Sequence, residues 1–215
     1  MAVSTVLWDW NGTLINDVPL CFDILNRLLT RHGYAPVQNV AAYKNIFCFP
    51  IEEYYRRAGF RFEQFPFAQL ADEYIEMYVP ESMHCPLQPG AVETLQKLQQ
   101  QGKRQIILSA SRTDILEQQL CTLGVRQYFD TVLGIADIYA HSKVEIGRQW
   151  INTSGTDKAG VVMLGDCEHD HEVAGAMGVQ CVLFSGGHQP KALLQTHGVP
   201  VIENLADFPL LINEV

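Results

Sequence analysis

The sequence lacks the features that mark several large classes of protein. It has no apolar run near the ~18 residues that a membrane-spanning helix needs, and no internal repeat or low-complexity segment. Basic residues are scarce, with 15 Lys and Arg against 24 Asp and Glu, so the net charge is −9. Because a nucleic-acid-binding protein needs a basic face to meet phosphates, we expect neither a nucleic-acid partner nor a membrane.

Cysteine motifs and targeting signals are also missing. No two of the six cysteines form a Cys-x-x-Cys pair, which disfavours a structural zinc site, and we expect most of them to be buried as small apolar groups. The first five residues contain neither a basic segment nor a long apolar one, so we expect no signal peptide. These features predict a cytoplasmic protein. They do not fix its oligomeric state, for which we expect a monomer or a weak dimer.

The sequence does contain the pattern of an α/β protein. Its 215 residues, of which 47% are hydrophobic, suffice for one large domain or for a domain with a smaller insert. Short apolar runs typical of buried parallel strands occur at Val3–Trp8, Ile106–Leu108, Thr131–Ile135, Val161–Leu164 and Cys181–Phe184. Helical patterns separate them, beginning near Gly90, Thr113, Lys143 and His169. This alternation predicts a doubly wound, Rossmann-like parallel sheet.

One segment, from about Asp17 to Cys85, breaks the alternation. It carries helical patterns only, at Leu20–Leu29, Ile51–Ala58 and Phe67–Val79, and holds seven of the ten Phe residues. We therefore expect an α/β core made of residues 1–16 and 86–215, with residues 17–85 inserted as an α-helical cap over the carboxyl edge of the sheet.

Polar residues directly after the apolar runs are the candidates for chemistry, because ligands of open parallel sheets sit at the carboxyl ends of the strands. Asp9, Ser109 and Asp166 each follow a different run, and Lys143 and Asp170 come nearby in sequence order. Any one of them alone is typical of a turn or a helix cap. The ordered set of two acids and a hydroxyl points instead to one shared site.

This ordered set resembles the haloacid dehalogenase superfamily of aspartate-nucleophile hydrolases, in its phosphoglycolate-phosphatase-like branch. The first family motif, D-x-D-x-T-[LV], stands here as Asp9-Trp10-Asn11-Gly12-Thr13-Leu14. The second motif matches Ser109 and the third matches Lys143. The fourth, G-D-x-x-x-D, is Gly165-Asp166-Cys167-Glu168-His169-Asp170. The resemblance covers almost the whole chain, and the helical insert lies where family members carry their cap.

The resemblance implies a Mg²⁺-dependent phosphatase of a small phosphorylated metabolite, with Asp9 as the nucleophile that forms an aspartyl-phosphate. Asp9, Asp166 and the main-chain carbonyl of Asn11 would hold the metal, and oxygen ligands of this kind suit Mg²⁺. A divalent cation is needed because the attacking carboxylate and the phosphate are both anionic.

The other motif residues have implied roles around the phosphate. Gly12 allows a tight loop whose main-chain N–H groups face the phosphoryl oxygens, and Ser109 would donate a hydrogen bond to one of them. Lys143 would neutralise developing charge, and Asp170 would hold Lys143 or a metal-bound water. The catalytic set implied is Asp9, Asn11, Ser109, Lys143 and Asp170. The phosphate site implied is Asp9, Trp10, Asn11, Ser109, Ala110 and Lys143.

The chain departs from the family pattern at Asn11, where phosphatases usually carry a second Asp that serves as general acid and base. An amide cannot transfer a proton at neutral pH, and that step is worth ~10²–10⁴ in rate. His169 is a candidate replacement. Two alternatives stay open: a carbon–phosphorus bond hydrolase that forms a Schiff base on Lys44, and a nearly inactive phosphate-binding protein.

Several further side chains have two interpretations. Arg56 and Arg57 could meet an acidic tail of the substrate or form a solvated helix face. The aromatic residues of the insert, Phe47, Phe49, Tyr54 and Tyr55, could line the roof of the pocket or form the core of the insert. His169 and His171 resemble a metal pair, but residues two apart on a helix point away from each other.

Overall fold

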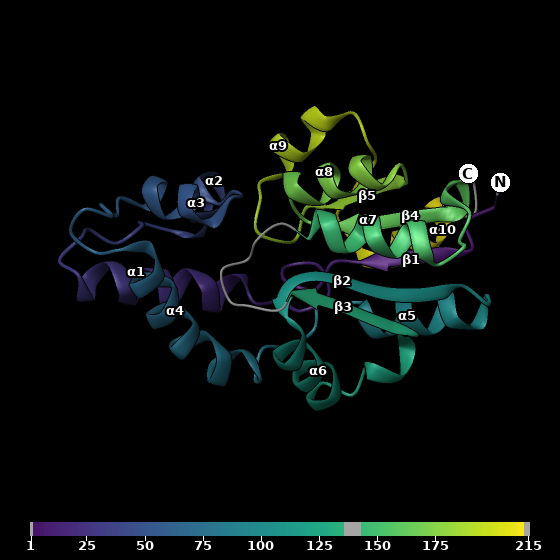
Figure 1. Cartoon of the computed structure of the whole chain (residues 1–215), viewed down its shortest axis with the longest axis horizontal. Helices are drawn as coiled ribbons and strands as arrows, with labels where there is room; N and C mark the ends of the chain where they lie inside the picture. The colour runs from purple at the N-terminus through teal and green to yellow at the C-terminus, as the bar shows by residue number, and fades with distance from the viewer. Residues whose placement is uncertain (1, 136–142, 213–215) are drawn as a thin grey trace.

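A six-stranded parallel sheet forms the centre of this computed structural model, which describes residues 2–135 and 143–212 (Figure 1). The strands are β1 (Thr5–Trp8), β2 (Arg104–Arg112), β3 (Thr131–Ile135), β4 (Val161–Gly165), β5 (Gln180–Phe184) and β6 (Val201–Ile202). Their spatial order is β3-β2-β1-β4-β5-β6. The chain runs outward from β1 to β3 and returns to the centre at β4, so the switch point lies between β1 and β4. The expected doubly wound sheet is confirmed.

Helices cover both faces of the sheet. They are α5 (Ala91–Gln100), α6 (Thr113–Thr122), α7 (Val144–Thr153), α8 (Glu168–Met177), α9 (Lys191–Leu194) and α10 (Phe208–Leu211), with 3₁₀ turns at Arg126–Tyr128, Lys158–Gly160, Gln195–His197 and Leu205–Asp207. Val6 and Trp8 of β1 pack in the cluster formed with α5, α6 and α10, whereas Leu7 packs with α7 and α8. This alternation is the period of two expected for a strand buried on both faces.

The register of β1 with its two neighbouring strands determines where the site lies. Trp8 pairs with Ile107 of β2 and with Leu164 of β4. Since all three strands are parallel, the residues that follow them emerge at the same edge. One boundary differs from expectation: β2 continues past Leu108 to Arg112, with a register irregularity in its pairing with β3, so Ser109 lies within the strand rather than after it.

The insert is helical throughout, which confirms the expected cap. It contains α1 (Val18–Arg31), α2 (Val40–Ile46), α3 (Ile51–Ala58) and α4 (Phe67–Ser82). These helices bury their own hydrophobic cluster, which includes Leu28, Tyr43 and Leu70. Figure 1 shows the cap beyond the end of the sheet that lies away from the N-terminus. The domain limits at residues 17 and 85 stay a prediction.

Some elements have too short or too weak a pattern to be predicted: α2, α9, α10 and the two-residue β6. Five of the six cysteines are buried, as expected, and Cys121 is exposed. Within residues 2–135 and 143–212, no helix combines the length and the apolar character needed to cross a bilayer.

Candidate active site

Two carboxylates meet at the switch point of the sheet. Asp9 directly follows β1 and Asp166 directly follows β4, and their exposed fractions are only 6% and 2%. The hydroxyl of Thr13 lies 3.1 Å from Oδ2 of Asp9 and 3.3 Å from Oδ1 of Asp166. Because a hydroxyl has a single hydrogen, it can donate to only one of the two carboxylates at a time. Both acids line the same cavity.

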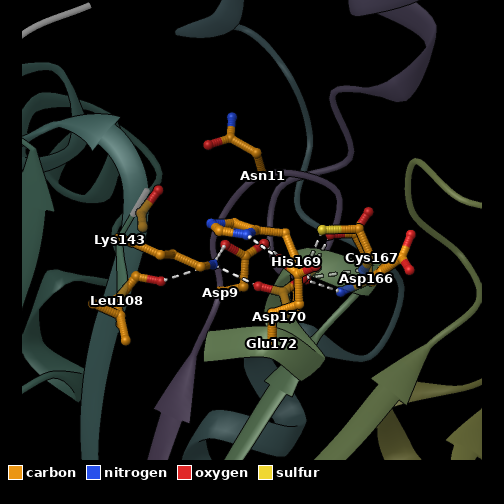
Figure 2. Close-up of polar contacts among 12 residues, drawn as sticks. Asp9, Asn11, Leu108, Lys143, Asp166, Cys167, His169, Asp170 and Glu172 are labelled. Carbon is orange, nitrogen blue, oxygen red and sulfur yellow. Dashed lines mark hydrogen bonds and ion pairs between the residues drawn. The ribbon is translucent and has the colours of Figure 1, made fainter. Parts of the chain in front are cut away.

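Lys143 forms ion pairs with Asp9 and with a third buried acid, Asp170. Its ammonium lies 2.6 Å from Oδ1 of Asp9 and 2.5 Å from Oδ1 of Asp170, and it also donates to the carbonyl of Leu108 (Figure 2). The other oxygen of Asp170 accepts the backbone N–H groups of Asp166 and Cys167 at 2.9 and 3.1 Å. Asp170 therefore holds Lys143 directly, which was one of its two expected roles.

Burial and crowding perturb the protonation of these acids. Burial raises the pKa of Asp9 to about 8, with Lys143 opposing and the charges of Asp170 and Asp166 adding to the effect. Burial likewise raises the pKa of Asp166 to about 6. Lys143 holds the pKa of Asp170 below its ordinary value, although burial acts in the opposite direction. The lysine thus stabilises the ionised form of Asp170, whereas Asp9 and Asp166 hold their protons to a higher pH than ordinary carboxyl groups do.

The donor set at this position fits a hard divalent cation. Asp9 and Asp166 offer carboxylate oxygens on adjacent strands, and the carbonyl of Asn11 lies two residues after Asp9. Two other groups have the ligand atoms of a metal site: Asp166 with Cys167 and Asp170, and Asp17 with Cys21 and His188. Asp17 and Asp170 have more hydrogen-bond and ion-pair partners than Asp9 or Asp166. Asp9 contacts Lys143 and Thr13, and Asp166 contacts Thr13 and the N–H of His188, so Asp9 with Asp166 is the better candidate pair.

The loop after β1 needs glycine at position 12. Gly12 has φ +74°, and a Cβ atom there would overlap the carboxylate of Asp166 and the ring of His188. Gly187 has the same role on the opposite side, since a Cβ atom there would also overlap Asp166. Both backbones therefore lie against the carboxylate of Asp166, where a larger residue has no room.

The side chain of Asn11 belongs to a network at the junction of core and cap. Its amide nitrogen donates to Asp17 at 2.8 Å and to the hydroxyl of Tyr78 at 2.7 Å, and its oxygen accepts from Ser111 at 2.6 Å. Figure 2 shows this side chain directed away from Asp9. Asp17 also accepts from the N–H of Gly12 and from Tyr78, both at 2.8 Å. The amide thus has a structural use whatever its role in catalysis.

His188 is a site residue that the sequence patterns did not identify. It lies in the loop after β5, its N–H donates to Asp166, and its ring is bonded to Tyr43 at 2.8 Å and to Asp17 at 3.2 Å. Burial alone would lower the pKa of His188, but the charge of Asp17 and their hydrogen bond raise it above its ordinary value. The sequence offered only its position as a signal, because the loop after β5 leaves the sheet at the same carboxyl edge as Asp9.

His169 has an arrangement suited to proton transfer. Nδ1 lies 3.0 Å from Glu172, whereas Nε2 is buried with no hydrogen-bond partner among the described residues. The imidazole lines the cavity together with Asp9, and it stacks on Phe49 of the cap at 4.4 Å. Figure 2 shows it extending from α8 toward the group of Asp9 and Lys143.

The implied phosphate site is only partly assembled around the cavity. Asp9, Asn11, Ala110 and Lys143 line it, and Ser111 does as well. Ser109 is buried beside this wall, where its hydroxyl accepts the N–H of Ser111, and its expected phosphate contact stays a prediction. The indole of Trp10 is turned into the core, where it donates to Gln119, so only its main chain could serve the phosphate.

The structure distinguishes between the two interpretations that the sequence allowed for several side chains. Phe47 and Phe49 line the cavity, while Tyr54 and Tyr55 are buried in the cluster of the cap. Arg56 and Arg57 form exposed ion pairs with acids of their own helix. Lys44 donates to the carbonyl of Gly186 and does not line the cavity. The ring of His171 lies against that of His197 at a tilt of 32°, which agrees with the expectation that His171 does not pair with His169.

Comparison with known proteins supports the sequence resemblance. Residues 6–184 match the family model described as haloacid dehalogenase-like hydrolase. A phosphoglycolate phosphatase of Caulobacter vibrioides is 24% identical, over 96% of this chain and 89% of that protein. A predicted phosphatase from Clostridium acetobutylicum has a TM-score of 0.85 at 19% identity, with both chains covered completely. A haloacid dehalogenase-like hydrolase of Streptococcus pneumoniae has a TM-score of 0.83 at 16% identity, over 97% of this chain and 98% of that one.

The ion pairs of Lys143 predict a large effect on stability. Replacing the ammonium by an apolar group, in Lys143→Met, leaves Asp9 and Asp170 buried without their cation, and we expect a loss of about 3–5 kcal/mol in the free energy of unfolding. Urea denaturation in metal-free buffer measures this, with Lys97→Met on the exposed face of α5 as the matched control. Equal stability of the two variants would contradict the described ion pairs.

Proposed function

The chain belongs to the haloacid dehalogenase-like hydrolases, and we propose that this phosphatase hydrolyses small phosphate monoesters in two steps through an aspartyl-phosphate at Asp9. The observation that carries the proposal is the meeting of Asp9 and Asp166 at the switch point, with Thr13 between them and Lys143 bonded to Asp9. Carboxylate, lysine and a second acid at one buried point match what phosphoryl transfer to a carboxylate requires.

The first step is an attack on phosphorus by a carboxylate oxygen of Asp9. As that bond forms, the bond between phosphorus and the ester oxygen breaks, and the alcohol leaves with a proton. In the second step a water oxygen bonds to phosphorus and one proton of the water passes to the group that protonated the alcohol in the first step. The bond between phosphorus and Asp9 breaks, and inorganic phosphate is released with the carboxylate regenerated. Lys143 orients Asp9 and offsets the negative charge that accumulates on the phosphoryl oxygens.

Mg²⁺ is the cofactor that suits this site. Asp9, Asp166 and the carbonyl of Asn11 would hold it, and when bound it would offset the repulsion between the carboxylate and the phosphate. Asp170 bonds to Lys143 and so keeps the ammonium in position beside Asp9. The excess of buried carboxylates over cations supports a need for a divalent ion here.

Contacts between the cap and the core support a role for the cap in excluding water from the reacting group. Phe47 stacks on His188 at 4.6 Å and Phe49 stacks on His169 at 4.4 Å, and both phenyl rings come from the cap. The carbonyl of Phe47 also accepts from Gln189. A cap held against the core in this way encloses a small soluble substrate, and it must open for the substrate to enter.

His169 is the group that we propose for the proton on the leaving oxygen. Asn11 has no proton to give and is fixed by Asp17 and Tyr78. Both ring nitrogens of His188 have partners, whereas Nε2 of His169 has none among the described residues. Glu172 bonds to the other nitrogen, as an acid that orients an imidazole does in other general acid–base pairs.

The carbon–phosphorus hydrolase is the less well supported alternative. Burial lowers the pKa of Lys44, which would suit an amine that forms a Schiff base. However, this amine donates to the carbonyl of Gly186 and does not line the cavity. A borohydride-trapped adduct on Lys44 would revive this alternative, and saturable phosphate binding without turnover would favour a binding protein.

Removing the nucleophile tests the intermediate. We expect Asp9→Asn to lose at least ~10³-fold in kcat, because the amide cannot form the acyl phosphate. Borohydride reduction of wild-type protein during turnover should convert residue 9 to homoserine, detected by peptide mass spectrometry. Turnover that persists in Asp9→Asn would contradict the mechanism.

Removing the carboxylate of Asp166 tests whether this residue binds the metal. EDTA should abolish phosphate release and Mg²⁺ should restore it. By calorimetry we expect Asp166→Asn to bind Mg²⁺ at least ~10-fold more weakly than wild type. The matched control is Asp72→Asn, an exposed acid on α4, which should bind like wild type. Unchanged affinity in Asp166→Asn would remove Asp166 from the ligand set.

A dependence on the leaving group tests His169. We expect His169→Asn to lower kcat/KM for an alkyl phosphate by ~10²-fold or more, because the alkoxide needs a proton. The same variant should affect 4-nitrophenyl phosphate far less, since its phenolate leaves without one. His171→Asn, on the same helix but outside the cavity, is the control. Equal losses for both substrates would assign His169 a structural role only.

A further inference from the structure

The half of the cavity that faces the cap is apolar. Its wall is made of Phe47 and Phe49 near α2, Ile51 of α3, and Tyr74 and Ile75 of α4. The acids and Lys143 stand on the opposite wall, which belongs to the core. A phosphoryl group at Asp9 would therefore direct its organic group toward aromatic and aliphatic side chains.

Two polar side chains of the cap wall, those of Tyr78 and Cys21, are already engaged at Asp17. The hydroxyl of Tyr78 donates to Asp17 and accepts from Asn11, and Cys21 donates to the same carboxylate. Burial of charge without a partner is unfavourable, so a wall of this kind admits neutral groups more readily than ionised ones.

No free cation faces this half of the cavity among residues 2–135 and 143–212. Lys143 is shared by Asp9 and Asp170. Of the two histidines that line the cavity, His188 is paired with Asp17 and His169 is paired with Glu172. The arginines of α3 point to acids on their own helix. Residues 136–142, which lie outside the described part, contain neither Lys nor Arg in their sequence. A second anionic group on the substrate would thus meet carboxylates and phenyl rings.

The cavity is also small, at about 150 Å³. An apolar cavity on the order of 150 Å³ accommodates a molecule the size of benzene. Part of the volume must hold the phosphoryl group, so the organic group has room for only a few carbon atoms, unless the cap moves outward.

We propose that the natural substrate is a phosphate monoester whose organic group is small, uncharged and predominantly apolar, and not a phosphorylated carboxylic acid. This inference rests on the proposed phosphatase function and narrows its substrate class. The proposed substrate class differs from the substrate in the name of the Caulobacter relative, phosphoglycolate, because glycolate carries a carboxylate.

Two substrates of the same shape test the proposal. Isobutyl phosphate and phosphoglycolate differ in that two methyl groups replace the two carboxylate oxygens. With Mg²⁺ present, we expect kcat/KM for isobutyl phosphate to exceed that for phosphoglycolate by at least ~10-fold, because no cation compensates the carboxylate. Equal rates, or a preference for phosphoglycolate, would overturn the proposal and leave the phosphatase function intact.

A binding measurement keeps the test independent of turnover. Isobutylphosphonate and phosphonoacetate are inert compounds with the same difference in shape and charge, and calorimetry with Mg²⁺ compares their affinities directly. If no monoester is hydrolysed but isobutylphosphonate binds at least ~10-fold more tightly, the proposed turnover fails and the specificity stands. Equal or tighter binding of phosphonoacetate would refute the specificity even in an inactive protein.

A charge introduced on the apolar wall should reverse the preference. Ile75→Arg places a guanidinium on the cavity side of α4, and we expect the ratio of kcat/KM to shift toward phosphoglycolate by ~10-fold or more. Ala68→Arg adds the same charge on an exposed position of the same helix and should leave the ratio unchanged. An equal shift in both variants would mean that net charge alone, and not the cavity wall, sets the preference.

Discussion

The balance of charge at the carboxyl edge of the sheet is the constraint on which the rest of the site depends. Among residues 2–135 and 143–212, the cationic partners of the four buried carboxylates, those of Asp9, Asp17, Asp166 and Asp170, are Lys143 and His188. Buried charges without partners are strongly unfavourable, so each of these acids must be compensated. Asp170 takes the lysine and Asp17 takes the histidine. The two acids that remain incompletely balanced are those that flank the switch point, which is where a cation and an anionic substrate would together restore neutrality.

The same charges connect the cap to the core. Asp17 stands just before α1, at the point where the chain enters the cap, and it gathers donors from both parts of the molecule. Tyr43 of α2 reaches His188 from the opposite side. Since His188 also donates its N–H to Asp166, the position of the cap is linked to a residue of the reaction site by two hydrogen bonds. Closure of the cap and order at the acid are therefore parts of one network.

Much of this arrangement could be predicted from the sequence, because the signals are local. The strands before Asp9 and Asp166 are continuous apolar runs, and the order of the acids, Lys143 and Asp170 follows the family motifs. The remainder depends on contacts between distant segments. Nothing near His188 in the sequence indicates its partners, which lie 145 and 171 residues away in Tyr43 and Asp17. The extension of β2 to Arg112 escaped prediction for a similar reason: the pairing with β3 continues the strand where the apolar run has ended.

The asparagine at position 11 also makes physical sense within this network. Its nitrogen donates to the buried Asp17, so a carboxylate in its place would put a second anion against Asp17 unless one of the two were protonated. The amide avoids that conflict and adds a donor for Tyr78, but it removes a proton carrier from the first motif. With Asp17 at this junction, Asn11 helps to hold the cap against the core through Asp17 and Tyr78. Position 11 then has no acid that could protonate the leaving group. Under the proposed mechanism the proton would come from another wall of the cavity. The imidazole of His169 stands there with one nitrogen bonded to Glu172 and the other without a partner in the described structure.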